Sequence, residues 1–196
     1  MLKQQLIESL YQIQAIKFGN FTLKSGALSP IYFDLRLITS YPTILKQVSD
    51  LLFKKINSLT FDIICGVPYT AIPIATALSI RHDLSMVLKR KEAKDHGMKK
   101  MVEGAFTPGQ TCLIIEDVIT SGMSIAETIV TLKAEGLNVA DVAVVLDREQ
   151  QGKEKLEAQG LTVHSLLTLS EVLRTLDARG HINAATLEEV RIYAKL

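Results

Sequence analysis

Two adjacent carboxylates and a group of small hydroxyl residues follow one apolar segment of the sequence. Glu116 and Asp117 end the run "CLIIED", and the next residues include Thr120, Ser121, Gly122 and Ser124. Small residues leave backbone N–H groups open, hydroxyl groups add donors, and the start of a helix favours an anion. The carboxylates suit a neighbouring polyol, or a divalent metal on its hydroxyl groups. This pattern predicts a ribose 5-phosphate site, with a plain helix cap beside solvated carboxylates as the alternative.

A second candidate is the basic segment "KRKEAKDHGMKK", residues 89–100. It holds six Lys or Arg side chains against two acids and one histidine, in a chain whose formal net charge is only +1. Such a segment suits a nucleic-acid backbone, an acidic partner or a small phosphorylated substrate, or it is simply solvated. The near-zero net charge argues against a general nucleic-acid binder.

Apolar patterning predicts an alternating α/β chain that positions both segments. After an amphipathic N-terminal helix come two short strands, "FTLKSG" and "SPIYFDLR". Further strands are predicted in "FDIICGV", "LSMVLKR", "VEGAF", "TCLIIED", "VADVAVVLDR" and "LTVHSLLTL". Helices are predicted near residues 42–57, 71–79, 123–135, 152–159, 170–178 and 184–194. Near-continuous apolar runs are typical of strands covered on both faces, as in parallel sheets.

Ligands of such α/β sheets bind at the carboxyl ends of the strands. The turns after "FDIICGV", "TCLIIED" and "VADVAVVLDR" are therefore expected to carry the chemistry. The sequence contains neither the Walker pattern Gly-x-x-x-x-Gly-Lys-Ser/Thr nor the dinucleotide pattern Gly-x-Gly-x-x-Gly.

Composition places the chain among soluble globular proteins, with 47% hydrophobic and 22% charged residues. Its 196 residues are expected to form one domain. No apolar run approaches the roughly 18 residues of a membrane span, and the N-terminus lacks the continuous apolar stretch of a signal sequence. Cys65 and Cys112 lie in apolar runs and are expected to be buried and reduced. A cytoplasmic location follows as an expectation.

The motif "IIEDVITSG" resembles the phosphoribosyl-pyrophosphate (PRPP) motif of type I phosphoribosyltransferases: hydrophobic residues, two acids, then Thr-Ser-Gly. Neighbouring segments narrow the resemblance to the orotate phosphoribosyltransferases. "RKEAKDHG" is similar to their catalytic loop, "FTLKSGALSPIYFDLR" to their N-terminal substrate segment, and "LDREQQG" to their orotate-binding strand end. "GVPYTAIPIA" and "KRKEAKDHGMKKMVEGAF" look most like the transferase half of bifunctional UMP synthases. The Asp-x-Lys-x-x-Asp mark of the decarboxylase half is not found, so residues 1–196 are expected to form the transferase domain alone.

The resemblance implies an α/β fold of the type I phosphoribosyltransferase kind, with a central, mainly parallel sheet flanked by helices. About residues 1–40 would form a small hood over the base. The implied reaction transfers the 5-phosphoribosyl group from PRPP to orotate with Mg²⁺, giving orotidine 5′-monophosphate and pyrophosphate in pyrimidine biosynthesis. Catalysis of this kind rests on positioning and on stabilising the departing pyrophosphate. Mg²⁺ would arrive with PRPP, with Glu116 and Asp117 as candidate ligands.

The resemblance also assigns roles residue by residue. The implied catalytic residues are Lys94, His96 and Asp117. The implied PRPP-binding residues are Lys24, Tyr69, Thr70, Arg90, Lys91, Lys94, His96, Glu116, Asp117, Val118, Ile119, Thr120, Ser121, Gly122, Met123 and Ser124. The implied orotate-binding residues are Lys24, Tyr32, Phe33, Thr120 and Arg148. Many bacterial relatives carry a lysine at the position of Thr70, so this chain lacks that cation and offers a hydroxyl in its place.

In this family the catalytic loop reaches the active site of a second subunit, so a homodimer sharing residues 90–100 is implied. The other implied partners are the two small-molecule substrates, without nucleic acid or membrane. A purine phosphoribosyltransferase would keep the central motif but would not explain "RKEAKDHG" or "SPIYFDLR". A ligand-sensing regulator that binds nucleic acid is the alternative from another class, although no DNA-binding helical extension is visible. The histidines outside these motifs are expected to be structural or exposed: His82, His164 and His181.

Overall fold

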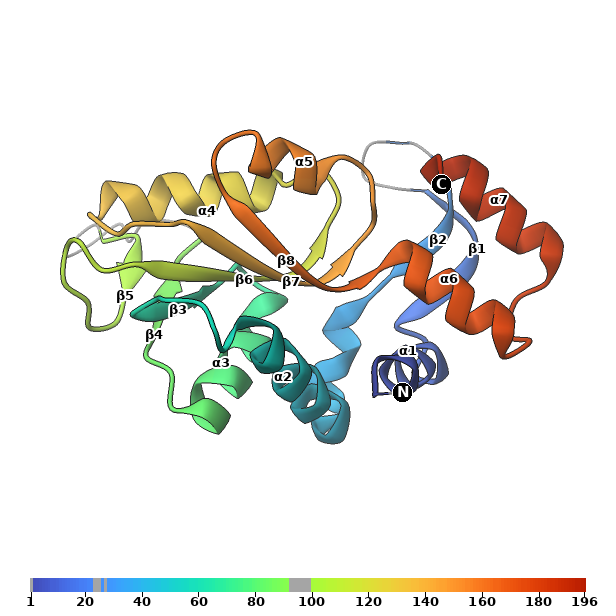
Figure 1. Cartoon of the computed structure of the whole chain (residues 1–196), viewed down its shortest axis with the longest axis horizontal. Coiled ribbons are helices and arrows are strands. Elements are labelled where there is room, and N and C mark those ends of the chain that lie inside the picture. The colour runs from blue at the N-terminus through green and yellow to red at the C-terminus, as the bar shows by residue number, and fades with distance from the viewer. Residues whose placement is uncertain (1, 23–25, 27, 92–99) are drawn as a thin grey trace.

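The computed structural model describes residues 2–22, 26, 28–91 and 100–196. Within them, six strands form the main sheet, in the order β5-β4-β3-β6-β7-β8 (Figure 1). The strands are β3 (Ile63–Gly66), β4 (Met86–Lys89), β5 (Val102–Glu103), β6 (Cys112–Ile119), β7 (Asp141–Asp147) and β8 (Thr162–Thr168). Neighbouring strands run parallel, except for the antiparallel pair β4 and β5. The predicted mainly parallel α/β sheet is confirmed.

Helices cover both faces of this sheet because its strands are apolar on both sides. On β6, Leu113 and Ile115 join one buried cluster with α2 and α3, whereas Cys112 and Ile114 join a second cluster with α4 and α5. Figure 1 shows the two helix layers on opposite sides of the sheet. These helices are α2 (Pro42–Ile56), α3 (Ala71–His82), α4 (Met123–Ala134) and α5 (Gly152–Glu157). Both cysteines are free and fully buried, as predicted.

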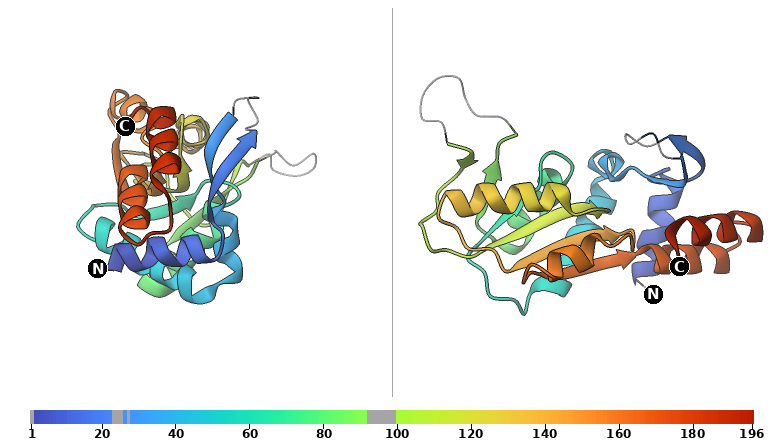
Figure 2. Two further views of the ribbon diagram at one scale, coloured as in Figure 1. Left: turned by 90° about the vertical axis from the view of Figure 1, so that its right-hand side faces the viewer. Right: turned by 90° about the horizontal axis from the view of Figure 1, so that it is seen from above.

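The N-terminal and C-terminal segments gather at one end of the sheet. The hairpin of β1 and β2 stands beside the last helix, and both chain ends lie on this side (Figures 1 and 2). These elements are α1 (Leu2–Gln12), β1 (Ile16–Thr22), β2 (Leu28–Phe33), a 3-10 helix η1 (Leu35–Ser40), α6 (Leu169–Ala178) and α7 (Ala184–Ala194). The hairpin pairs Ile16 with Phe33 and Phe18 with Ile31 in antiparallel register.

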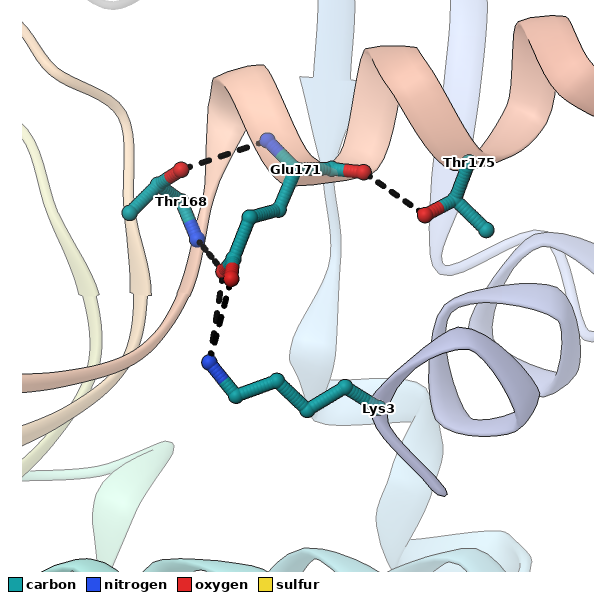
Figure 3. A network of polar contacts seen from close by, with 4 residues as sticks. All are labelled: Lys3, Thr168, Glu171 and Thr175. Atoms are coloured by element: carbon teal, nitrogen blue, oxygen red, sulfur yellow. Dashed lines mark hydrogen bonds and ion pairs between the residues drawn. The ribbon is translucent and has the colours of Figure 1, made fainter. Parts of the chain in front are cut away.

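A polar network ties α1 to α6 (Figure 3). Glu171 and Thr168 form a capping box, in which the Glu171 N–H donates to Thr168 Oγ1 at 3.2 Å and the Thr168 N–H donates to Glu171 Oε2 at 3.0 Å. Lys3 Nζ lies 3.2 Å from Glu171 Oε1. The cap satisfies N–H groups that the first turn of a helix leaves free, and the ion pair fixes the N-terminal helix against it.

Several predicted boundaries were wrong. The strand predicted in "FTLKSG" already begins at Ile16, and the strand predicted in "VEGAF" ends at Glu103. The strand predicted in "SPIYFDLR" ends at Phe33, because the Arg36 side chain turns back onto Asp34 and the chain continues as η1. The helix predicted to end near Ser79 continues to His82. Its last turn is held by Asp50 of α2, which pairs with Arg81 at 2.7 Å and lies 3.3 Å from His82.

The histidines outside the motifs have structural surroundings, as expected. The His82 ring stacks on Phe53 with centroids 3.8 Å apart, and His164 Nε2 lies 2.7 Å from Asp141 Oδ1. The His181 ring lies 4.9 Å from that of Tyr11. None of the described helices is long and apolar enough to cross a membrane.

Candidate active site

The paired carboxylates lie at the carboxyl end of β6, between β3 and β7. Glu116 is only 5% exposed, and its Oε1 accepts a hydrogen bond from the Asp117 N–H at 3.0 Å. Burial, together with the neighbouring Asp117 carboxyl, raises the pKa of Glu116 well above its usual range. Burial also raises the pKa of Asp117. Hydroxyl groups or a cation at this pair would stabilise its charged form.

A small cavity of about 120 Å³ lies at the turn from β6 into α4. It is lined by Glu116, Val118, Ile119, Thr120, Ser121, Gly122, Met123, Ser124 and Ile125. Gly122 precedes the helix with a φ of 78°, a left-handed conformation that favours glycine. Ser121 Oγ accepts from the Met123 N–H at 3.5 Å. Exposed hydroxyl residues therefore lie at the start of a helix, where an anion is favoured, and phosphate binding there stays a prediction.

Two of the predicted PRPP residues, Val118 and Ile119, pack their side chains into the two cores on either side of the sheet. Both residues also line the cavity, and their contact with PRPP stays a prediction.

Gly152, at the start of α5, lies directly beneath this loop. A Cβ atom at this position would lie 2.5 Å from the carbonyl oxygen of Thr120 and 2.8 Å from Ile119 Cγ1. The carbonyl oxygen of Gly152 in turn lies 3.3 Å from where a Cβ on Gly122 would be. This contact shapes the 120–124 loop. Sequence reasoning did not predict it, because nothing local marks a glycine at the start of a helix as a packing point.

Tyr69 and Thr70 lie in the loop after β3, directly before α3 and at the same end of the sheet as the turn after β6. Gly66 lets this helix approach, because a Cβ there would lie 2.8 Å from the Ala71 carbonyl oxygen. Tyr69 is exposed, and Lys91 Nζ lies 5.5 Å from the centroid of its ring. The structure therefore brings together two residues from separate segments that the sequence assigned to PRPP.

Arg90 has a partner within the fold. Its NH1 donates to Glu103 Oε1 at 2.6 Å, and its backbone N–H donates to the Met101 carbonyl at 2.8 Å, so Arg90 joins the β4 and β5 ends of the basic segment. Its predicted contact with PRPP stays a prediction. Lys24, Lys94 and His96 lie outside the described residues.

Arg148 follows β7 and is buried, with 7% of the residue exposed. Its NH2 donates a hydrogen bond to Ser29 Oγ at 3.4 Å, and its Cζ lies 5.7 Å from the centroid of the Phe33 ring. Nε has no hydrogen-bond partner among the described residues, and no described carboxylate pairs with the side chain. Burial lowers the pKa of Arg148 below its ordinary value. A buried cation that lacks a carboxylate suits an anionic ligand.

Tyr32 and Phe33, predicted together as base contacts, point to opposite faces of β2 because side chains alternate along a strand. Phe33 lies beside Arg148. Tyr32 instead packs beside Phe21, with ring centroids 5.4 Å apart, and its hydroxyl accepts from Arg36 NH2 at 3.0 Å. The two side chains therefore have different surroundings, and their contacts with a base stay a prediction.

Sequence reasoning also missed Ser29 and Tyr193, which surround Arg148. Ser29 is buried, and its hydroxyl donates to the Ile31 carbonyl at 2.7 Å. Burial would raise the pKa of Tyr193, but contacts with Ser29, Gln150 and Arg148 outweigh burial and lower it. Tyr193 belongs to α7, far from Arg148 in sequence, so no spacing pattern could have joined them.

The acidic pair also fits the Mg²⁺ that the resemblance implied. Across the described ranges, no three His, Cys, Asp or Glu side chains converge as a metal site. Mg²⁺ is typically held by one or two carboxylates together with oxygens of a phosphorylated substrate. Burial and mutual proximity raise the pKa of the Glu116 carboxyl, and a cation shared with substrate would relieve that cost.

Comparisons with known proteins agree with this geometry. The profile of the phosphoribosyl transferase domain matches residues 37–163. Uridine 5′-monophosphate synthase of Bos taurus is 52% identical over 188 residues, which cover 95% of this chain and 39% of that protein. Orotate phosphoribosyltransferase of Chlamydia caviae is 44% identical over 177 residues, which cover 89% of this chain and 86% of that protein. The chain thus spans about two-fifths of the bovine relative and most of the chlamydial one.

Solved structures extend the same likeness to the fold. UMP synthase of Leishmania donovani superimposes with a TM-score of 0.91 at 33% identity, covering 98% of this chain and 42% of that chain. Orotate phosphoribosyltransferase of Mycobacterium tuberculosis in complex with PRPP superimposes with a TM-score of 0.72 at 25% identity, covering 88% and 99%. The predicted type I fold is confirmed. The chain belongs to the phosphoribosyl transferase family, among its orotate phosphoribosyltransferases.

Proposed function

We propose that the chain transfers the 5-phosphoribosyl group of PRPP to orotate, releasing pyrophosphate and forming orotidine 5′-monophosphate for pyrimidine biosynthesis. The observation that carries this proposal is the common edge of the sheet that presents a phosphate loop, a carboxylate pair and the buried cation Arg148. Orotate differs from the other common nucleobases in carrying a carboxylate, which is the group that a buried guanidinium recognises.

The ribose part of the site lies along β6. Residues 120–124 bind the 5′-phosphate through backbone N–H groups and hydroxyls at the start of α4. Glu116 and Asp117 accept hydrogen bonds from the ribose hydroxyls. As the bond from C1′ to pyrophosphate lengthens, its electrons leave with pyrophosphate and positive charge develops on the ribose. The carboxylates, Asp117 foremost, stabilise that charge because they are fixed and partly desolvated.

Mg²⁺ bound with PRPP would offset the negative charge of the pyrophosphate, and Glu116 and Asp117 are the residues that would hold it beside the ribose hydroxyls. The protein positions the two reactants so that N1 of orotate faces C1′ while pyrophosphate departs from the other side. No covalent intermediate with a side chain is needed.

The base part of the site lies between the β1–β2 hairpin and the turn after β7. Arg148 pairs with the carboxylate or a carbonyl oxygen of orotate, and Phe33 packs against it. Residues 1–40 act as the hood of a single 1–196 transferase domain. Lys24, Tyr32 and Thr120 complete the proposed set of orotate-binding residues.

The basic segment closes the site over pyrophosphate. Lys94 stabilises the leaving group, and His96 donates a hydrogen bond or a proton to it. Lys91, Arg90, Tyr69 and Thr70 contact the same group from the ends of β4 and β3. We further propose that the chain works as a cytoplasmic homodimer in which residues 90–100 reach the site of the partner subunit.

Base selectivity tests the proposed function. The purified chain is incubated with PRPP, Mg²⁺ and either orotate, uracil, adenine or hypoxanthine, and loss of each base is followed by absorbance and product analysis. We expect orotate alone to be consumed, with equal release of pyrophosphate, and Asp117→Ala to lose this activity. Turnover of a purine base without turnover of orotate would overturn the proposal.

A further inference from the structure

Arg36 makes three hydrogen bonds at the turn where β2 ends. Its Nε donates to Asp34 Oδ1 at 2.6 Å, and its NH2 donates to Asp34 Oδ2 at 2.9 Å and to the Tyr32 hydroxyl at 3.0 Å. The Asp34 side chain is only 18% exposed, whereas that of Arg36 is 64% exposed. One exposed cation therefore holds the last residues of β2 and the first residues of η1 in a single arrangement.

The backbone around this turn is fixed to the core. The Asp34 N–H donates to the Ala15 carbonyl at 2.8 Å, which ties the turn to the segment before β1. Leu35 and Ile38 of η1 are buried. The Arg36 side chain thus projects from a rigid base, and its position is set by Asp34 and Tyr32.

Arg36 is the last residue of "FTLKSGALSPIYFDLR", the segment that resembles the N-terminal substrate segment of the family. The resemblance assigned substrate contacts to Tyr32 and Phe33 in this segment, but no role to Arg36.

A second arginine shows what a purely structural pair looks like in this fold. Arg81 binds both oxygens of Asp50, at 2.8 and 2.7 Å, and so joins α3 to α2. It lies at the carboxyl end of α3, the end away from Tyr69 and Thr70. Exposed pairs of this kind contribute little to stability. Arg36 has the same two-oxygen geometry, but adds a hydrogen bond to the Tyr32 hydroxyl.

We propose that Arg36 is a positioning residue for the substrate site: it holds the Tyr32 hydroxyl through a direct hydrogen bond and so fixes the orientation of this side chain on the base-binding strand. This inference rests on the proposed function and deepens it. Because Arg36 acts through Tyr32, its loss should change the binding of orotate more than the binding of PRPP.

Steady-state kinetics of Arg36→Gln, Tyr32→Phe and the double variant test this inference. We expect each single variant to raise KM for orotate about tenfold, as loss of a charge-assisted hydrogen bond would. KM for PRPP should change less than about twofold, and kcat should fall less than KM rises. The double variant should be no worse than Arg36→Gln alone, because residues that act through one contact are not additive.

Two controls separate positioning from folding. Arg81→Gln removes the matched surface pair and should leave both KM values unchanged, and Arg36→Lys should recover only part of the orotate affinity because an ammonium cannot reproduce the planar fork. Thermal unfolding of Arg36→Gln should match that of the wild type. Wild-type KM values for Arg36→Gln, or additive effects in the double variant, would overturn the inference. A wild-type chain that does not consume orotate would instead refute the proposed function itself.

Discussion

Arg148 and Glu116 are buried ionisable side chains, and neither is neutralised by an opposite charge within the part of the protein that the structure describes. Burying such groups without partners costs stability, and proteins retain them where a ligand supplies the partner. For this chain the expected ligand groups are the carboxylate of orotate at Arg148 and ribose hydroxyls with a cation at Glu116. The stability lost by burying each of these two groups can be measured separately in the ligand-free protein.

Arg148→Met should stabilise the fold while removing orotate recognition. Methionine fills a similar volume without a charge to desolvate, so Tm should rise by about 2–4 °C, as a gain near 1 kcal/mol would give in a chain of this size. KM for orotate should rise at least about 100-fold, because a buried ionic contact is lost. Calorimetry and kinetics check the two effects. Arg174→Met, at an exposed position of α6, is the control and should change neither; an unchanged KM in Arg148→Met would remove this residue from the base site.

Glu116→Gln should flatten the pH dependence of stability. Burial raises the pKa of Glu116 above the usual 4.5, so the folded state binds more protons than the unfolded state. Stability of the ligand-free protein therefore falls as pH rises above that value, and glutamine removes this loss. Between pH 5 and 8, the free energy of unfolding measured with urea should fall by about 1 kcal/mol less in the variant than in the wild type. Glu127→Gln, exposed on α4, should keep the wild-type slope; equal slopes for all three proteins would contradict the pKa shift.

At the scale of elements, the phosphate loop depends on α5 beneath it. Gly152→Ala would place a methyl group 2.5 Å from the Thr120 carbonyl oxygen, so the loop must move. A displaced anion site should lower kcat/KM for PRPP roughly 10- to 100-fold. The measurement is steady-state kinetics together with thermal unfolding.

Gly160→Ala provides the control for that change, because it lies just beyond the other end of α5. Its φ of +82° makes alanine unfavourable, yet nothing lies within 4 Å of the added atom. It should lose about 1–2 kcal/mol of stability without a change in KM for PRPP. If Gly152→Ala behaves in the same way, α5 does not shape the phosphate site.

The sequence predicted much of this architecture because its strongest signals are local. The apolar runs around "CLII" and "VAVVL" predicted the buried parallel strands β6 and β7. The hydroxyls and glycine after β6 predicted a loop that leads into a helix, and phosphate binding by that loop stays a prediction. The bounds were predicted less well: β1 begins at Ile16, ahead of "FTLKSG", and α3 extends to His82, where Arg81 pairs with Asp50 of α2. The local pattern also could not predict that the side chains of Tyr32 and Phe33 have different neighbours.

Contacts between distant segments were beyond such signals. Arg148 meets Ser29 across 119 positions and lies near Tyr193 of the last helix, so the surroundings of the base site emerge only when the chain is folded. Arg36 was hidden for a different reason. Its role depends on where its side chain turns, and "DLR" reads equally well as the end of a strand.

At the scale of the whole molecule, sharing of residues 90–100 between subunits predicts complementation. Inactive Lys94→Ala and inactive Asp117→Ala chains are mixed, unfolded and refolded together. A shared loop leaves one intact site in each mixed dimer, so about one quarter of the wild-type activity should return. Without sharing, both sites of a mixed dimer carry one defect.

The control for this experiment replaces the Asp117→Ala chain with the double variant Lys94→Ala/Asp117→Ala. No site of that mixture escapes substitution, so activity should stay absent. Failure of the first mixture to recover, with mixed dimers demonstrated by mass, would show that each chain closes its own site.

The most direct test of the whole account is a crystal structure of the chain with orotidine 5′-monophosphate. The account predicts the phosphate in the 120–124 loop, the ribose hydroxyls within hydrogen-bond distance of Glu116 or Asp117, and the orotate carboxylate or a carbonyl oxygen on Arg148. A nucleotide bound away from this edge of the sheet, or an orotate ring that does not reach Arg148, would contradict it.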